Sequence, residues 1–259
     1  MYEQGHPSPN DASTSASASF VPKYHPLTKL ISQITFGMHL LHKRLAKSDS
    51  EVVRILQRHV NAMDEFRSTT TRDLDLAKLD IATRIRNLKV PLEPGWASVV
   101  FENMLRNDAS FRRQIIDGNK KVEAVVRRTA RSVGKAMTDV GEGLKAVDEL
   151  AKYLLTLQPK NTGKSDNGAG VNGWRNANLE RVYGAMTYNV EGWFRCFQAL
   201  QAKGHHLGAR LGLLRSVVLE IEERCGRANE GLLGVPPGSA RVSISNHLTF
   251  DIWVLYVGS

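Results

Sequence analysis

The sequence is poor in the residues that usually reveal a protein's class. Only two cysteines occur among its 259 residues, so it has neither a disulfide framework nor a Cys-x-x-Cys metal site. No uninterrupted apolar run approaches the ~20 residues of a membrane-spanning helix, and the N-terminus lacks the basic and apolar regions of a secretory signal. We therefore expect a cytoplasmic protein, peripheral at most to a membrane, with buried free thiols at Cys196 and Cys225 and no transmembrane segment.

The rest of the composition is that of a globular protein, with 42% hydrophobic and 24% charged residues. Residues 1–24 are rich in Ser, Ala, Pro and Asn and are predicted to form a disordered tail. Residues 25–230 are predicted to form one helical domain, interrupted by a flexible, glycine-rich loop at 159–173. Beyond it we interpret 231–259 as an irregular tail, either disordered or weakly packed, or as the product of an altered gene model.

Apolar residues at steps of three and four predict three long helices and two shorter ones. The apolar stripes run over residues 27–45, 52–88, 96–106, 111–157 and 179–225. The first helix is expected to end near Lys47. Ser48 and Glu51 form a capping box for the second helix, and Asp108 is expected to cap the fourth.

The last stripe has the most regular spacing, with a mean of about 3.5 residues, which is the period of a coiled-coil seam. It predicts that Trp193, Phe197, Leu207 and Leu211 are buried. Because long helices cannot bury such stripes alone, we predict an all-α fold, an elongated antiparallel bundle with coiled-coil-like packing. The seam is also a candidate surface for a homodimer or a protein partner.

Three glycines in the last helix, Gly204, Gly208 and Gly212, are spaced by four residues. Each costs about 1 kcal/mol of helix stability relative to alanine, so their presence needs a reason. One interpretation is a helix-contact groove that admits another helix closely. The other is a tolerated weak patch.

The stretch Thr162–Ser165 reads TGKS, which often closes a phosphate-binding loop. Such a loop also needs a glycine five residues before the Gly-Lys pair, after a strand and before a helix, but Gln158 stands at that position. The histidines His39, His42, His205 and His206 lack the acidic neighbours of a bundle metal site. We expect no cofactor, no metal and no catalytic residue.

Basic residues concentrate between Ser110 and Met137. The segment holds eight of them against two acids, so it carries +6 of the net charge of +9. They are Arg112, Arg113, Lys120, Lys121, Arg127, Arg128, Arg131 and Lys135. At 100° per residue, most of them lie on the face opposite the apolar stripe, over roughly 33 Å.

Three interpretations of this stripe remain open. It is a solvated helix face, an anionic-membrane surface, or a nucleic-acid surface. No aromatic residues interleave with it, so stacking on single-stranded nucleic acid is not supported. Among its eight basic residues stand only two acids, Asp117 and Glu123, which leaves several like charges close together.

The phrases FGMHLLHKRLAKSDSEVVRILQRHV, DELAKYL and NVEGWFRCFQALQAKGHHLG resemble those of large uncharacterised helical proteins of filamentous fungi. The resemblance covers about residues 30–230 and implies no activity. Three long helices with a basic face are also similar in outline to BAR-type membrane-curving domains, which lends no residues. The sequence thus favours a non-enzymatic scaffold that binds anionic membrane or dimerises, with a nucleic-acid-associated or purely protein-binding module as the alternative.

We expect the Lys164→Ala variant to behave like the wild type, because the TGKS stretch lacks the frame of a phosphate-binding loop. Calorimetric titration with Mg-ATP should show no specific binding to either protein. Binding to the wild type that disappears in the variant would contradict this interpretation.

Overall fold

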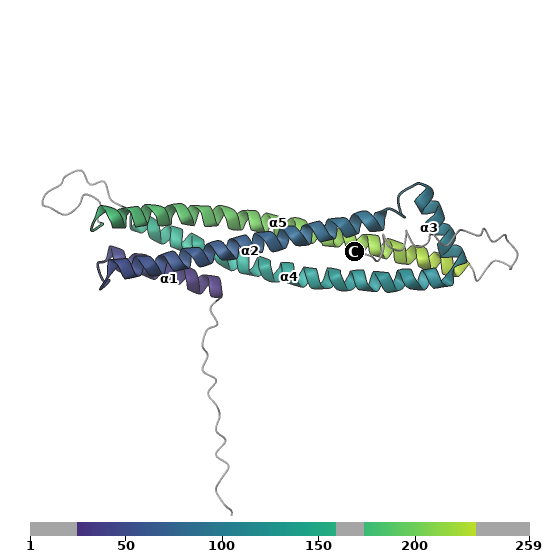
Figure 1. The fold of residues 1–259 in the computed structure, drawn as a ribbon, viewed down its shortest axis with the longest axis horizontal. Coiled ribbons are helices and arrows are strands. Elements are labelled where there is room, and N and C mark those ends of the chain that lie inside the picture. The colour runs from purple at the N-terminus through teal and green to yellow at the C-terminus, as the bar shows by residue number, and fades with distance from the viewer. Residues whose placement is uncertain (1–24, 159–173, 232–259) are drawn as a thin grey trace, which may run out of the picture.

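A computed structural model describes residues 25–158 and 174–231, and every regular element in these ranges is helical. The fold is therefore all-α, as predicted. The five helices are α1 (Pro26–His42), α2 (Asp49–Lys89), α3 (Trp96–Asn107), α4 (Ala109–Thr156) and α5 (Ala177–Gly231). They form an elongated bundle in which α2, α4 and α5 run along the long axis (Figure 1). The predicted tails and the loop at 159–173 lie outside the described residues, apart from Gly231.

The directions of the long helices follow from their cross-contacts. Trp193 Nε1 donates to Asp64 Oδ1 over 3.4 Å, and Lys203 Nζ lies 2.7 Å from Asp75 Oδ2. Residue numbers rise together along this pair, so α2 and α5 are parallel. On the other side of α5, the hydroxyl of Tyr183 donates to the Leu154 carbonyl over 3.1 Å.

The side-chain amide of Asn119 donates to the Val218 carbonyl over 3.4 Å. Since Asn119 precedes Leu154 while Val218 follows Tyr183, α4 and α5 are antiparallel. The long helices thus run up, down and up again along the bundle.

The seam of α5 forms the centre of the core. The described seam residues are buried from Leu179 to Cys225, apart from the half-buried Val182, and Phe197, Leu207 and Ile221 have almost no accessible surface. The seam packs on α4 and α2 of the same chain. The expectation that this seam serves a second copy or a partner is therefore wrong, because the intramolecular core occupies it.

The short helix α1 lies between α2 and α4 over one half of the bundle (Figure 1). His25 fixes its start: Nδ1 accepts from the Leu27 N–H over 3.3 Å, and Nε2 lies 2.7 Å from Asp139 Oδ1. The helix ends at His42 rather than near Lys47, because Arg44 adopts a left-handed φ of 60° that an α-helix cannot continue. Leu45, counted in the stripe, is exposed.

Ser48 and Asp108 are confirmed as N-caps, whereas the carboxylate of Glu51 accepts from Arg54 over 2.6 Å rather than completing a capping box. Ser48 Oγ accepts from the Glu51 N–H over 3.4 Å, and Asp108 Oδ1 accepts from the N–H groups of Ser110 and Phe111 over 2.7 and 3.0 Å. Such caps satisfy donors that the first turn of a helix leaves without partners. They define the sharp corner from which α4 starts.

Leu207→Ala should destabilise the protein by about 2–5 kcal/mol, because the leucine is 1% exposed and its truncation leaves a cavity. Leu213→Ala, six residues later on α5 and 43% exposed, is the matched control and should change stability by less than about 0.5 kcal/mol. Urea denaturation followed by circular dichroism measures both. Equal effects of the two changes would mean that the seam is not the core.

Candidate polyanion-binding surface

Seven of the eight predicted basic residues are exposed on α4, and we call them the basic ridge. The ridge consists of Arg113, Lys120, Lys121, Arg127, Arg128, Arg131 and Lys135. The buried residues Val122, Val133 and Val140 lie on the opposite side of the helix and pack into the core. One face of α4 therefore holds the fold together while the other carries charge.

The ridge has few acidic partners. Lys120 pairs with Asp117 over 3.1 Å, and no other ridge residue forms an ion pair with the described parts of the chain. Elsewhere the bundle pairs many of its cations within a helix, as in Arg84 with Asp80 and Lys152 with Asp148. The positive potential of the ridge is therefore largely uncompensated at close range.

Arg112 does not belong to this surface, which corrects its predicted role. It is only 9% exposed, and its Nη1 donates to the carbonyls of Leu105 and Arg106 over 2.5 and 3.3 Å. These carbonyls stand at the end of α3, where a helix has acceptors without partners. Arg112 thus joins the end of α3 to the start of α4. Charge alone did not separate Arg112 from Arg113, but at 100° per residue Arg112 lies about 100° away from Arg113, towards the buried side of α4.

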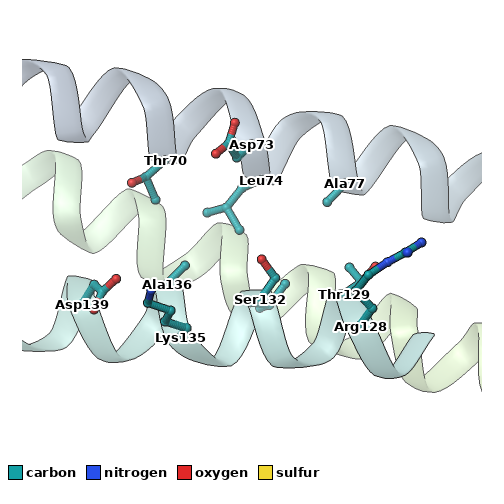
Figure 2. A pocket seen from close by; sticks show the side chains of 11 residues that line it. Thr70, Asp73, Leu74, Ala77, Arg128, Thr129, Ser132, Lys135, Ala136 and Asp139 are labelled. Atoms are coloured by element: carbon teal, nitrogen blue, oxygen red, sulfur yellow. The ribbon is translucent and has the colours of Figure 1, made fainter. Parts of the chain in front are cut away.

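Two ridge residues also border a groove between α2 and α4. The groove has a volume of about 460 Å³. It lies next to the N-terminal end of α1, because its lining residue Asp139 is bonded to His25 there. Figure 2 shows its lining from the two helices. From α2 come Thr70, Asp73, Leu74 and Ala77, and from α4 come Arg128, Thr129, Ser132, Val133, Lys135, Ala136 and Asp139.

The groove has mixed charge. Arg128 and Lys135 would attract an anion, and the hydroxyls of its lining could donate to one, but Asp73 and Asp139 lie in the same groove. Asp139 is already bonded to His25. The groove therefore does not favour an anion by itself, whereas the outward face of the ridge does.

His39, His42 and His206 each contact a neighbouring side chain of the fold. His39 Nδ1 lies 2.8 Å from the Tyr153 hydroxyl, and the His42 ring meets Trp174 edge-on at 5.1 Å. Burial lowers the pKa of His42, and the neighbouring Lys43 lowers it further. His206 accepts from Arg210 over 3.0 Å. Within the ranges that the structure describes, no three His, Cys, Asp or Glu residues come together as metal ligands.

The two cysteine thiols are not activated. Burial raises the pKa of Cys225 to about 11, against the opposing effect of the nearby Arg112. Burial also raises the pKa of Cys196. Both groups are therefore held as thiols rather than thiolates, and the thiolate is the reactive form.

The three spaced glycines have different environments. A Cβ on Gly204 would lie 2.0 Å from Met137 Sδ, so this glycine admits α4 closely. Gly208 and Gly212 have open space on their side of α5. Within one chain only the first is a helix contact. Two further glycines, Gly37 against Leu56 and Gly143 against Phe197, also make close approaches.

Comparison with known proteins contributes no site. No family model, no curated protein and no solved structure matches this chain. None of the helices in the described ranges contains a stretch long and apolar enough to cross a bilayer. The candidate surface therefore rests on the geometry and charge of α4.

Adjacent arginines test this assignment. Arg112→Met should destabilise the protein by about 1–3 kcal/mol, because two carbonyls at the end of α3 lose their charged donor. Arg113→Met removes an exposed side chain and should stay within about 0.5 kcal/mol. Thermal and urea unfolding of both variants measure the difference. If Arg113→Met were instead the more destabilising change, Arg113 rather than Arg112 would make the structural contact.

Proposed function

We propose that this protein is a non-enzymatic, elongated helical scaffold that binds an anionic membrane surface peripherally through the basic ridge. The observation that supports the proposal is the arrangement of seven exposed cations along one face of α4, only one of which has an acidic partner in the described residues. The ridge from Arg113 to Lys135 is roughly 33 Å long.

The energetics favour a ligand for this face. Like charges on neighbouring turns of a helix destabilise it by a few tenths of a kcal/mol per pair. Near an anionic membrane the same residues each gain about 1 kcal/mol. Several ridge residues acting together would thus support binding, although each contributes little.

The shape of the bundle suits an extended surface better than a small ligand. The long helix α4 has 48 residues, which corresponds to roughly 72 Å. The ridge occupies the first part of this rod, on its outward face, and nothing in the described residues encloses it. A flat anionic surface can contact several ridge residues at once, whereas a small anion would contact only one or two.

Nucleic acid offers the same charge, but the ridge lacks the aromatic platform on which proteins stack the bases of single strands. No aromatic side chain interleaves with the cations, so base stacking has no platform. Nucleic acid remains an outcome that the following experiment distinguishes.

The Arg127→Glu/Arg128→Glu/Arg131→Glu variant should lose binding to anionic vesicles at least tenfold while keeping its fold. Vesicles of mixed phosphatidylserine and phosphatidylcholine should co-sediment the wild type, and phosphatidylcholine alone should not. Binding should weaken with salt, since the Debye length falls from about 10 Å at 0.1 M to about 3 Å at 1 M.

The matched control is Arg58→Glu/Arg86→Glu/Arg181→Glu, three exposed arginines on α2 and α5 without acidic partners in the described residues. Each triple variant changes the charge by −6, from +9 to +3. If both lose binding equally, net charge alone accounts for it and the ridge is not the site. Failure of the wild type to bind anionic vesicles at low salt, or tighter binding to duplex DNA, overturns the membrane proposal.

A further inference from the structure

The outer face of α5 carries a second heptad pattern beside the buried seam. Its six residues, which we call the outer face, are Gly208, Gly212, Arg215, Leu219, Glu222 and Gly226. They alternate at steps of four and three, and each follows a residue of the inner seam by one position. No described helix covers the centre of this face, where Leu219 is 51% exposed and Gly212 and Arg215 are exposed. At its far end Glu222 is half-buried and lines a groove with Arg113 and Ile116 of α4.

Within the described residues, the two charges on this face form no ion pair. The neighbouring acids Glu220 and Glu223 pair with Arg224 and Arg227 at 2.7 and 2.6 Å. Arg215 and Glu222 form no ion pair with any described residue. Two opposite charges thus lie on one helix face. They are too far apart to pair with each other, since seven residues span about 10 Å.

The face is complementary to itself about Leu219. When two copies of a helix pair antiparallel, residues equally far from the centre on opposite sides face one another. With Leu219 at the centre, Arg215 lies four residues before it and Glu222 three residues after it. Arg215 of each copy therefore comes within one residue, about 1.5 Å along the axis, of Glu222 of the other, which the two long side chains can span. Gly212 faces Gly226, so no side chain obstructs a close approach at either flank. A parallel pairing would instead set Arg215 against Arg215.

We propose that this face is the interface of an antiparallel, two-fold symmetric homodimer, held by Leu219 and two reciprocal Arg215–Glu222 ion pairs. The occupant is a second copy of this chain, because an identical helix in reverse direction presents the opposite charges in the matching register. The half-exposed Ile116 of α4, one turn before the Asn119 that bonds to Val218, adds apolar surface beside Glu222 and Gly226.

Such a dimer has a consequence for the basic ridge. The two-fold axis of an antiparallel helix pair is perpendicular to the plane of the two helices, so groups on one side of that plane stay on the same side in both copies. The helix α4 flanks α5 on one side, alongside Leu219. The ridges of both copies would therefore face the same way and meet near the axis. This consequence rests on the proposed function, whereas the interface itself does not.

Charge reversal and exchange test the interface. Sedimentation velocity over a concentration series should show the wild-type, full-length chain in monomer–dimer equilibrium. Arg215→Glu and Glu222→Arg should each weaken dimerisation at least tenfold, because each sets like charges opposite one another twice. The double variant Arg215→Glu/Glu222→Arg should return the dissociation constant to within about threefold of the wild type.

Position-specific cross-linking gives a second readout. Leu219→Cys places two thiols across the two-fold axis and should form a disulfide-linked dimer on mild oxidation, when the Cα atoms come within about 7 Å. Leu213→Cys, an exposed position of the same helix outside the face, should not. Circular dichroism of each variant controls for folding.

A wild type that remains monomeric at the highest soluble concentration overturns the interface. So does a dimer that ignores Arg215→Glu, or a double variant that stays as weak as the single ones. Vesicle binding is measured separately: a dimer that does not bind vesicles refutes the proposed function alone, and a monomer that binds them refutes this interface alone.

Discussion

The fold depends on burial of one continuous apolar seam along α5. This seam runs nearly the whole length of the longest helix, and no single neighbour is wide enough to cover it. The helices α4 and α2 share the task from two sides, α4 antiparallel and α2 parallel to α5. Polar contacts accompany both registers, one of them at the buried Asn119, and the seam stays covered from Leu179 to Cys225.

The same constraint decides where the protein can be exposed. Because α4 uses one face for the seam, its other face is free of packing demands and can hold seven cations. Because α1 has only 17 residues, it fills the space between α2 and α4 over half of the bundle, and the groove of Figure 2 begins where it stops. The surface features of this protein are thus consequences of how its helices pack rather than separate modules.

Much of the fold could be predicted from the sequence, because helix periodicity and capping are local. The helix order, both caps and the four aromatic and leucine positions expected in the seam are confirmed. The predicted end of α1 lies several residues beyond the real one, because an apolar pattern does not indicate that Arg44 adopts a left-handed conformation. Gly143 and Asn119 were missed for a different reason: their roles depend on Phe197 and Val218, which are far along the chain.

The candidate surface was predictable in outline and not in detail. A helical wheel separates the charged side of α4 from the apolar side, which is enough for the residues from Arg113 to Lys135. It also sets Arg112 apart from the charged side, but it cannot name the partners of that side chain, because these are carbonyls at the end of α3 and carbonyls carry no sequence signal. For the same reason it could not assign the seam to an intramolecular partner: periodicity shows that a face is buried, but not by which chain.

The basic ridge and the outer face of α5 lie on the same part of the rod, because Asn119 on α4 contacts Val218 on α5. This proximity links the two proposals thermodynamically. A surface that binds both ridges of a dimer makes the second contact intramolecular, with a high effective concentration. Linkage is reciprocal, so a membrane that prefers the dimer must also promote dimerisation by the same factor. Two weak interactions, a row of single charges and a narrow helix face, would in this way stabilise one another on an anionic surface while each stays weak in solution.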